Sequence, residues 1–261
     1  MRIALFSTCI GDALFPDASK ATALILSRLG HEVVYPEGQT CCGQMHINSG
    51  YQKQAAGIVE TYVDAFSDPS IDAVVAPSGS CVTSVRNHQE HVVKRYGTPA
   101  LVDGCRTTAQ KTYELSEFLV DVEGTTELGA YFPHRVTYHP SCHGKRMLKV
   151  GERPYQLLRN VEGMELVELG NAEECCGFGG TFAIKNADVS SAMAADKARH
   201  IADTNAEYVT GGDSSCLMNI AGVLSRQHYG VRAVHMAEIL ASTKDQPWTP
   251  SQAAYRKEAF L

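Results

Sequence analysis

Apolar and polar positions along the chain follow one order of patterns, and that order occurs twice. Short runs rich in β-branched or aromatic residues predict strands, and these runs cover residues 2–9, 32–35 and 73–76, then 135–142, 165–168 and 207–210. Apolar residues at helical spacing predict helices at residues 21–29, about 51–66 and onward from 81, then 154–159, about 188–205 and onward from 216. A final short apolar element covers residues 114–119 in the first half and 234–240 in the second.

Each half therefore reads as strand, helix, strand, loop, helix, strand and helix. Alternation of this kind predicts a parallel sheet covered by helices. We predict an α/β fold of two pseudo-symmetric repeats, each with a small parallel sheet flanked by helices in a Rossmann-like layering. The expected limits are residues 1–121 for the first repeat, 122–134 for a connector, 135–243 for the second repeat and 244–261 for a C-terminal tail that packs on the surface.

Eight of the nine cysteines follow the same duplication. They form two sets of four, which are Cys9, Cys41, Cys42 and Cys81, and Cys142, Cys175, Cys176 and Cys216. Matched members lie 133, 134 or 135 residues apart, and each adjacent pair precedes a glycine, Gly43 or Gly177. The cysteines follow predicted strands, and ligands of parallel sheets gather beyond the carboxyl ends of the strands. We expect each set to converge on one small volume and to bind a metal cofactor.

Four thiolates are the ligand count of an iron–sulfur cluster or of a closed zinc site. Many zinc sites use two cysteines separated by two residues, and neither half contains that spacing. Adjacent cysteines reach different irons of one cluster more easily than they reach one zinc ion. The pattern favours an iron–sulfur cluster of the 4Fe-4S type in one or both halves. Zinc in one of the sites and thiols without a metal are the alternatives.

Composition narrows the class of protein. The chain has 261 residues, of which 44% are hydrophobic and 20% charged, as in soluble globular proteins. Its net charge of −6 and scattered basic residues argue against nucleic-acid binding. No apolar run reaches the roughly 18 residues of a membrane span, and the start is too short for a signal peptide. We expect a cytoplasmic protein, attached to a membrane at most peripherally through partners, in which cysteines bind metal rather than form disulfides.

Three segments resemble the CCG cysteine-rich domain family. They are residues 138–146 (YHPSCHGKR), 175–181 (CCGFGGT) and 212–218 (GDSSCLM). The domain is duplicated in one of the subunits of heterodisulfide reductase and in iron–sulfur subunits of glycolate oxidase and glycerol-3-phosphate dehydrogenase. The stand-alone form seen here is similar to the lactate utilization proteins of the A type. The resemblance implies an iron–sulfur electron-transfer subunit that works with two partner proteins in oxidising L-lactate to pyruvate. It implies a subunit of an oxidoreductase complex rather than a complete enzyme, and it assigns no catalytic residue.

The chain departs from heterodisulfide reductase at one position of each repeat. In that enzyme each motif ends in Cys-x-x-Cys, and five cysteines hold a noncubane 4Fe-4S cluster. This chain has Ser78 and Asp213 where the first of those two cysteines would stand, so the disulfide-cleaving chemistry is not carried over. An oxygen ligand from Ser78 or Asp213 stays open. The alternatives to electron transfer are a disulfide or thiol oxidoreductase and a zinc-binding structural subunit.

Other residues near the cysteines receive simpler interpretations. Three histidines lie close to them in sequence, which are His46, His139 and His143. We expect these to be surface or hydrogen-bonded histidines rather than ligands. Lys145 and Arg146 are expected to be solvated instead of balancing a thiolate charge. Cys105 has no counterpart in the second half and is expected to be a small buried hydrophobic residue.

Overall fold

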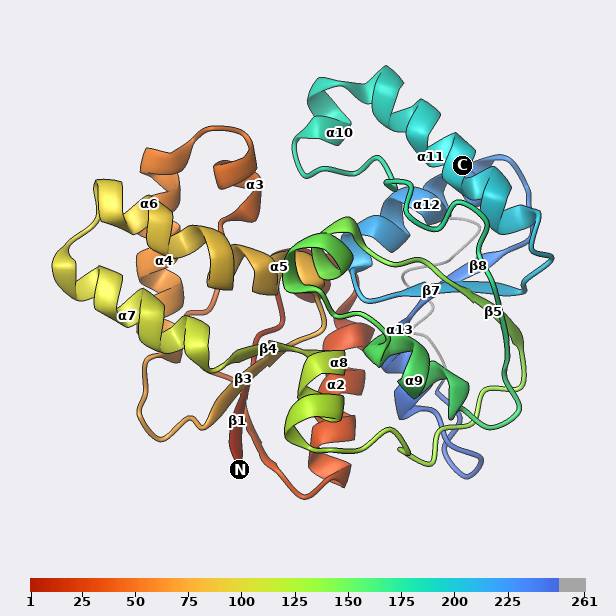
Figure 1. Cartoon of the computed structure of the whole chain (residues 1–261), viewed down its shortest axis with the longest axis horizontal. Coiled ribbons are helices and arrows are strands. Elements are labelled where there is room, and N and C mark those ends of the chain that lie inside the picture. Colours follow the sequence, from red (N-terminus) through yellow and green to blue (C-terminus); the bar gives the residue numbers. More distant parts are fainter. Residues whose placement is uncertain (249–261) are drawn as a thin grey trace.

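The two halves of the chain form two four-stranded parallel sheets of the same topology. The computed structural model describes residues 1–248. The strand order is β2-β1-β3-β4 in the first sheet and β6-β5-β7-β8 in the second. In Figure 1 the first half, coloured red to yellow, lies on the left, and the second half lies on the right. The prediction of an α/β fold with two pseudo-symmetric repeats, each a parallel sheet flanked by helices, is confirmed.

The elements occur in closely matching order in both halves. Those of the first half are β1 (Arg2–Leu5), α1 (Cys9–Leu14), α2 (Pro16–Arg28), β2 (Glu32–Val34), α3 (Gln44–Asn48), α4 (Gln52–Phe66), β3 (Ala73–Ala76), α5 (Gly79–Thr83), α6 (Gln89–Tyr96), α7 (Pro99–Gln110), β4 (Thr112–Glu114) and α8 (Leu115–Glu117). Those of the second half are β5 (Arg135–Tyr138), α9 (Arg153–Arg159), β6 (Glu165–Val167), α10 (Phe182–Lys185), α11 (Ala187–Ala202), β7 (Tyr208–Gly211), α12 (Ser214–Arg226), β8 (Arg232–His235) and α13 (Met236–Ala241). Three π-helical turns are η1 (Ser84–His88), η2 (Phe118–Val122) and η3 (His143–Leu148).

Each sheet has a fourth strand that the sequence pattern did not predict. Strand β4 pairs with β3, and β8 pairs with β7, both in parallel. Each of these strands runs directly into a short helix through a capping box, formed by Glu114 with Glu117 and by His235 with Glu238. Because no turn residues separate strand from helix, the two elements read as one apolar segment in the sequence.

Successive residues of the strands face opposite sides of the first sheet. Ile3 and Val75 belong to a buried cluster with helix α2, whereas Ala4 and Val74 belong to another with helix α4. Helices therefore cover both faces, and the strands are apolar on both sides, as expected for a parallel sheet.

The two halves pack against each other through matched helices. Helix α2 of the first half contacts α13 of the second, and α8 of the first half contacts α9 of the second. All four lie in the middle of Figure 1. The largest buried cluster includes Leu26 and Phe118 from one half and Leu158 and Met236 from the other. One hydrophobic core is thus shared, and burial of this apolar area holds the two sheets in a fixed relation.

The last described residues lie against the second half. The indole Nε1 of Trp248 donates a hydrogen bond to Glu238 Oε2 at 3.1 Å, and the ring packs at the edge of the shared core. The rest of the expected tail, residues 249–261, falls outside the described residues. Among residues 1–248, no helix has the length and apolar character needed to cross a membrane.

Candidate metal centres

The cysteines gather where the direction of winding changes in each sheet. The connections from β1 to β2 and from β2 to β3 lead to opposite sides of β1. A crevice forms at such a switch point, beyond the carboxyl ends of the two central strands. Cys9 begins α1 just after β1, and Cys81 lies in α5 just after β3. The second half repeats this arrangement, with Cys142 after β5 and Cys216 in α12 after β7.

A sharp turn delivers the first cysteine. Thr8, the residue before Cys9, has φ of +63°, a left-handed conformation that is uncommon outside glycine. Its hydroxyl accepts a hydrogen bond from the Gly11 N–H at 3.3 Å and caps helix α1. Strained backbone of this kind concentrates at functional sites, and here it turns the chain so that Cys9 faces the loop of Cys41.

The first set of cysteines closes around a small cavity. Cys9 Sγ lies 3.6 Å from Cys41 Sγ, and the Gly43 N–H donates to Cys41 Sγ at 3.3 Å. Cys42 and Cys81 are buried. All four cysteines line a cavity of about 30 Å³, together with Phe178 of the second half. The structure therefore brings together the four residues that the sequence grouped.

The second set has the same local geometry. The Gly177 N–H donates to Cys175 Sγ at 3.4 Å. The carbonyl of Cys176 accepts a hydrogen bond from Asn219 Nδ2 at 2.7 Å, as the carbonyl of Cys42 accepts from Ser84 Oγ at 3.0 Å. In both halves a side chain from the helix that carries the last cysteine, or from its π-helical continuation, thus fixes the loop of the adjacent pair.

Each set holds one thiol that loses its proton readily. The pKa of Cys41 is lowered to about 3 by hydrogen bonds from the thiols of Cys42 and Cys9, supported by the Gly43 N–H. The pKa of Cys175 is lowered in the same way by Cys142 and Cys176. The other partner in each contact is held protonated, because the hydrogen bond to Cys41 and burial raise the pKa of Cys9. The lowered pKa of the first cysteine in each adjacent pair favours the thiolate, the form that binds metal.

The distances between the sulfur atoms help to distinguish a single zinc ion from an iron–sulfur cluster. A zinc ion with four thiolates at about 2.3 Å puts all six sulfur pairs about 3.8 Å apart. Within residues 1–248, the one group of three or more such ligand atoms lying within 4.8 Å of one another is His139, Cys176 and Cys216. Cys9 Sγ and Cys41 Sγ have this spacing, but no three thiols of one set in this part of the chain lie within 4.8 Å of one another, as one tetrahedral ion requires. A cluster of several irons accepts a wider thiolate set, so the cysteines fit that group better.

Cys105 lies where the sequence predicts it, whereas His139 does not. Cys105 is buried among Val59, Val63 and Val93, away from both sets, as predicted. His143 Nδ1 lies 3.5 Å from Cys142 Sγ. His139 differs from its prediction, because it is buried and neither ring nitrogen has a hydrogen-bond partner. Burial lowers the pKa of His139 to about 4, which leaves a neutral imidazole.

Sequence reasoning missed Lys197, a buried cation beside the second set. Its Nζ donates to the carbonyls of Asn171 and Ala172, at 2.8 and 3.3 Å, in the loop that leads to Cys175. Burial lowers the pKa of Lys197. The signal was present in the sequence, since Lys197 falls on the apolar face of α11 with Ala194 and Ile201, where a lysine needs a specific reason.

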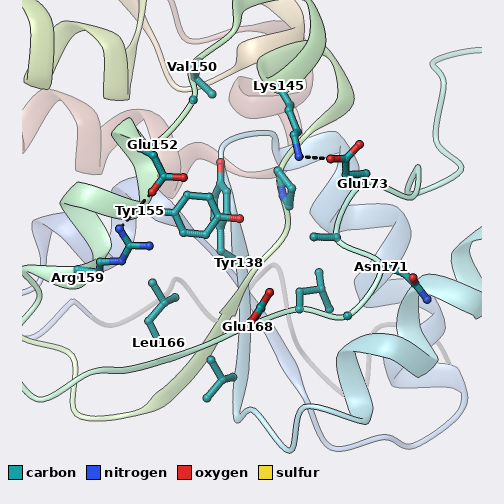
Figure 2. A pocket seen from close by; sticks show the side chains of 16 residues that line it. Tyr138, Lys145, Val150, Glu152, Tyr155, Arg159, Leu166, Glu168, Asn171 and Glu173 are labelled. Atoms are coloured by element: carbon teal, nitrogen blue, oxygen red, sulfur yellow. Dashed lines mark hydrogen bonds and ion pairs between the residues drawn. The ribbon is translucent and has the colours of Figure 1, made fainter.

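A second cavity, larger than the one at the first cysteine set, lies outside both sets. It measures about 730 Å³ and is lined by Tyr138 and Tyr155 among others. The rings of these two tyrosines pack edge to face, with their centres 5.0 Å apart. Figure 2 shows two ion pairs across its rim, Lys145 with Glu173 and Arg159 with Glu152. Lys145 is therefore engaged with a carboxylate at the surface and does not face a thiolate.

Comparison with known proteins agrees with this duplicated arrangement. The family model described as "CCG: Cysteine-rich domain" matches residues 3–86 and 136–221. "Lactate utilization protein A" of Oceanobacillus iheyensis is 46% identical over 94% of this chain and 98% of that protein. The protein of the same name from a Geobacillus species is 45% identical over 93% of this chain and 100% of its own length.

A solved structure extends the likeness of the fold. A hypothetical protein from Helicobacter pylori aligns with a TM-score of 0.61 and 10% identity, over 92% of this chain and 48% of that one. At this identity the likeness concerns the fold alone. The family model and the close relatives together settle membership: the chain belongs to the CCG cysteine-rich domain family and, within it, to the group of proteins named lactate utilization protein A.

Proposed function

We propose that this protein is an iron–sulfur electron-transfer subunit of a complex that oxidises L-lactate to pyruvate in the cytoplasm. The observation that carries the proposal is the pair of four-cysteine sets at the strand ends, in each of which a glycine N–H donates to the sulfur of Cys41 or Cys175. The lactate part is supported by relatives of 43 to 46% identity that are named for lactate utilization.

The protein's own residues would hold each cluster and set its environment. A bound iron–sulfur cluster supplies a group that accepts and releases single electrons. The four cysteines of each set would be the ligands of the cluster in that half. The N–H groups of Gly43 and Gly177 donate to sulfur, and such bonds stabilise the reduced, more negative state. Burial of Cys42, Cys81, Cys176 and Cys216 keeps water from the inner side of each site.

The proposal assigns the chemistry of lactate itself to partner subunits. The residues around the sulfurs of the first set are mainly thiols, small hydroxyls and apolar side chains. Oxidation of a 2-hydroxy acid needs a base for the hydroxyl proton and an acceptor for a hydride or for two electrons. We infer that a partner meets lactate first and that electrons then enter this subunit one at a time.

The test is metal and sulfide analysis of the full chain after anaerobic reconstitution with ferrous iron and sulfide. About four irons and four sulfides for each occupied site, with a paramagnetic signal that appears on reduction by dithionite, are the expected results. Lactate should produce the same signal only when the partner proteins are present. Zinc without sulfide or signal would instead make the chain a structural subunit.

A further inference from the structure

The two cysteine sets differ at the buried position three residues before their first cysteine. His139 lies three residues before Cys142, and Phe6 lies three residues before Cys9. Phe6 packs edge to face against Tyr62 and Phe66, with ring centres 5.1 and 5.4 Å apart. The first half therefore has an aromatic ring in an apolar cluster where the second half has an imidazole.

The imidazole of His139 lacks any hydrogen-bond partner among residues 1–248. Only 2% of the residue is exposed, and both Nδ1 and Nε2 are buried without a hydrogen bond. A buried polar nitrogen left unpaired costs about 1–3 kcal/mol, so native proteins rarely keep one without a role. A hydrogen-bonded core histidine would have shown a partner among the described residues, and His139 shows none.

The ring faces the second cysteine set. A ring nitrogen of His139 and the sulfurs of Cys176 and Cys216 all lie within 4.8 Å of one another, and all three residues are buried. Nitrogen and sulfur donors at this spacing suit one metal centre, since neutral imidazole and thiolate both ligate zinc and iron. The surroundings are polar as well, because the charges of Lys197 and Asp213 act on the ring, in contrast to the aromatic packing around Phe6.

We propose that His139 is a nitrogen donor to the metal centre of the second set, so that the two centres differ in kind. The first centre has cysteine donors alone, and the second has cysteines and one histidine. This inference rests on the proposed function only in that the second set binds a metal. Ligand type sets the electronic properties of iron–sulfur centres, so the two centres should titrate at different reduction potentials.

Pulsed electron paramagnetic resonance of the reconstituted, dithionite-reduced full chain tests this ligation. Cys41→Ser is used to disable the first set, and Cys175→Ser to disable the second. We expect a strongly coupled histidine nitrogen in the Cys41→Ser protein and none in the Cys175→Ser protein. Labelling with ¹⁵N-histidine should change the coupling frequency. An iron-loaded second centre without this nitrogen coupling would overturn the inference, even if iron and sulfide contents agree with the proposed function.

Two histidine variants complete the test. His139→Phe copies the residue of the first half and should lose the nitrogen coupling and shift one of the two reduction potentials. His88→Phe is the matched control, because His88 also has a buried ring nitrogen without a partner but lies outside both sets. It should keep the coupling. If the chain binds zinc alone, the proposed function fails, and X-ray absorption at the zinc edge then tests the inference about His139. A nitrogen among the atoms that coordinate zinc, lost in His139→Phe, supports the inference. Coordination by sulfur alone overturns it.

Discussion

Ser78 Oγ donates a hydrogen bond to Asp213 Oδ1 over 2.7 Å, and this bond joins equivalent positions of the two repeats. The two residues are 135 residues apart, the same offset as between Cys81 and Cys216. Asp213 Oδ1 also accepts from the N–H and hydroxyl of Ser80, at 3.1 and 2.7 Å. The positions where heterodisulfide reductase would carry a further cysteine are thus occupied in holding the halves together. The bond to Asp213 occupies the Ser78 hydroxyl and argues against ligation by Ser78. Asp213 Oδ2 is buried without a hydrogen-bond partner among the described residues, so an oxygen ligand from Asp213 stays open.

Removal of the Asp213 carboxylate should weaken the contact between the halves. Asp213→Ala leaves the buried hydroxyl of Ser78 and the half-buried donors of Ser80 without their acceptor, and each unsatisfied buried group costs about 1–3 kcal/mol. We expect a loss of about 3 kcal/mol in the free energy of unfolding, measured by chemical denaturation. Asp103, an exposed carboxylate paired with Arg106, supplies the control, and Asp103→Ala should change stability by less than about 0.5 kcal/mol. Equal effects of the two substitutions would contradict this account of the bond.

Single cysteine substitutions should separate the two centres. Cys41→Ser or Cys175→Ser removes the residue that forms the thiolate of its set, so each variant should lose the metal of one half and keep that of the other. Iron measured per chain should then fall to about half of the value for the unchanged protein.

Cys105→Ser provides the control for these substitutions. Cys105 is buried, whereas Cys41 and Cys175 are half-buried, and it lies in a separate apolar cluster. Metal content should therefore stay complete while stability falls by about 1–2 kcal/mol for the buried hydroxyl. Full iron content in Cys41→Ser would show that the first set is not a ligand set.

The duplication in the sequence predicted most of this architecture, because strand, loop and cysteine recur at nearly constant offsets. It did not predict the extra helices α6 and α7 of the first half as an insertion. The offset between matched residues falls from 135 at Cys81 and Cys216 to 121 at Glu114 and His235, because these helices lengthen the first half. The fourth strands were missed because their partners lie far away in sequence, and parallel pairing leaves no local turn signal.

The cysteine sets were predictable for a different reason than their surroundings. Residue type and spacing identify thiol ligands directly, whereas the roles of His139 and Lys197 depend on burial and on missing partners. A histidine before Cys142 looks the same in sequence whether it faces water or a metal centre. Only the packed structure shows that its ring has no hydrogen bond to any residue that the structure describes.

Stability should depend on pH through Glu114. Burial raises the pKa of Glu114 to about 7 from its ordinary 4.5. The folded protein therefore holds a proton that the unfolded chain has lost between these two values, and the stability associated with Glu114 declines as pH rises from about 4.5 through 7. Glu114→Gln keeps an acceptor oxygen for the Ser116 N–H and removes the ionisation.

The stability of Glu114→Gln relative to that of the unchanged protein should increase as pH rises. The difference in unfolding free energy should move in its favour by up to about 3 kcal/mol between pH 4 and pH 8. Urea denaturation at several pH values measures this. Glu165→Gln, at an exposed carboxylate paired with Arg135, is the control. A difference for Glu114→Gln that stays constant with pH would mean that Glu114 ionises as freely in the folded protein as in the unfolded chain.

The two glycines that follow the adjacent cysteines should differ in their tolerance of a side chain. Gly43 and Gly177 have nearly the same φ, +81° and +83°, so alanine at either position costs about 1–2 kcal/mol for a left-handed conformation. A Cβ at Gly43 would meet nothing closer than 3.7 Å, whereas one at Gly177 would come within 2.6 Å of the Ser190 carbonyl oxygen. Gly177→Ala must therefore also displace helix α11 or the loop of Cys175.

We expect Gly43→Ala to lose about 1–2 kcal/mol of stability with its metal content intact. Gly177→Ala should lose at least about 3 kcal/mol and bind less metal in the second half only, because the displaced loop carries Cys175 and Cys176. Thermal unfolding and iron analysis of the two variants, side by side, make the comparison, and each variant serves as the control of the other. Equal losses would show that left-handed strain alone, without the contact at Ser190, explains the need for glycine at both positions.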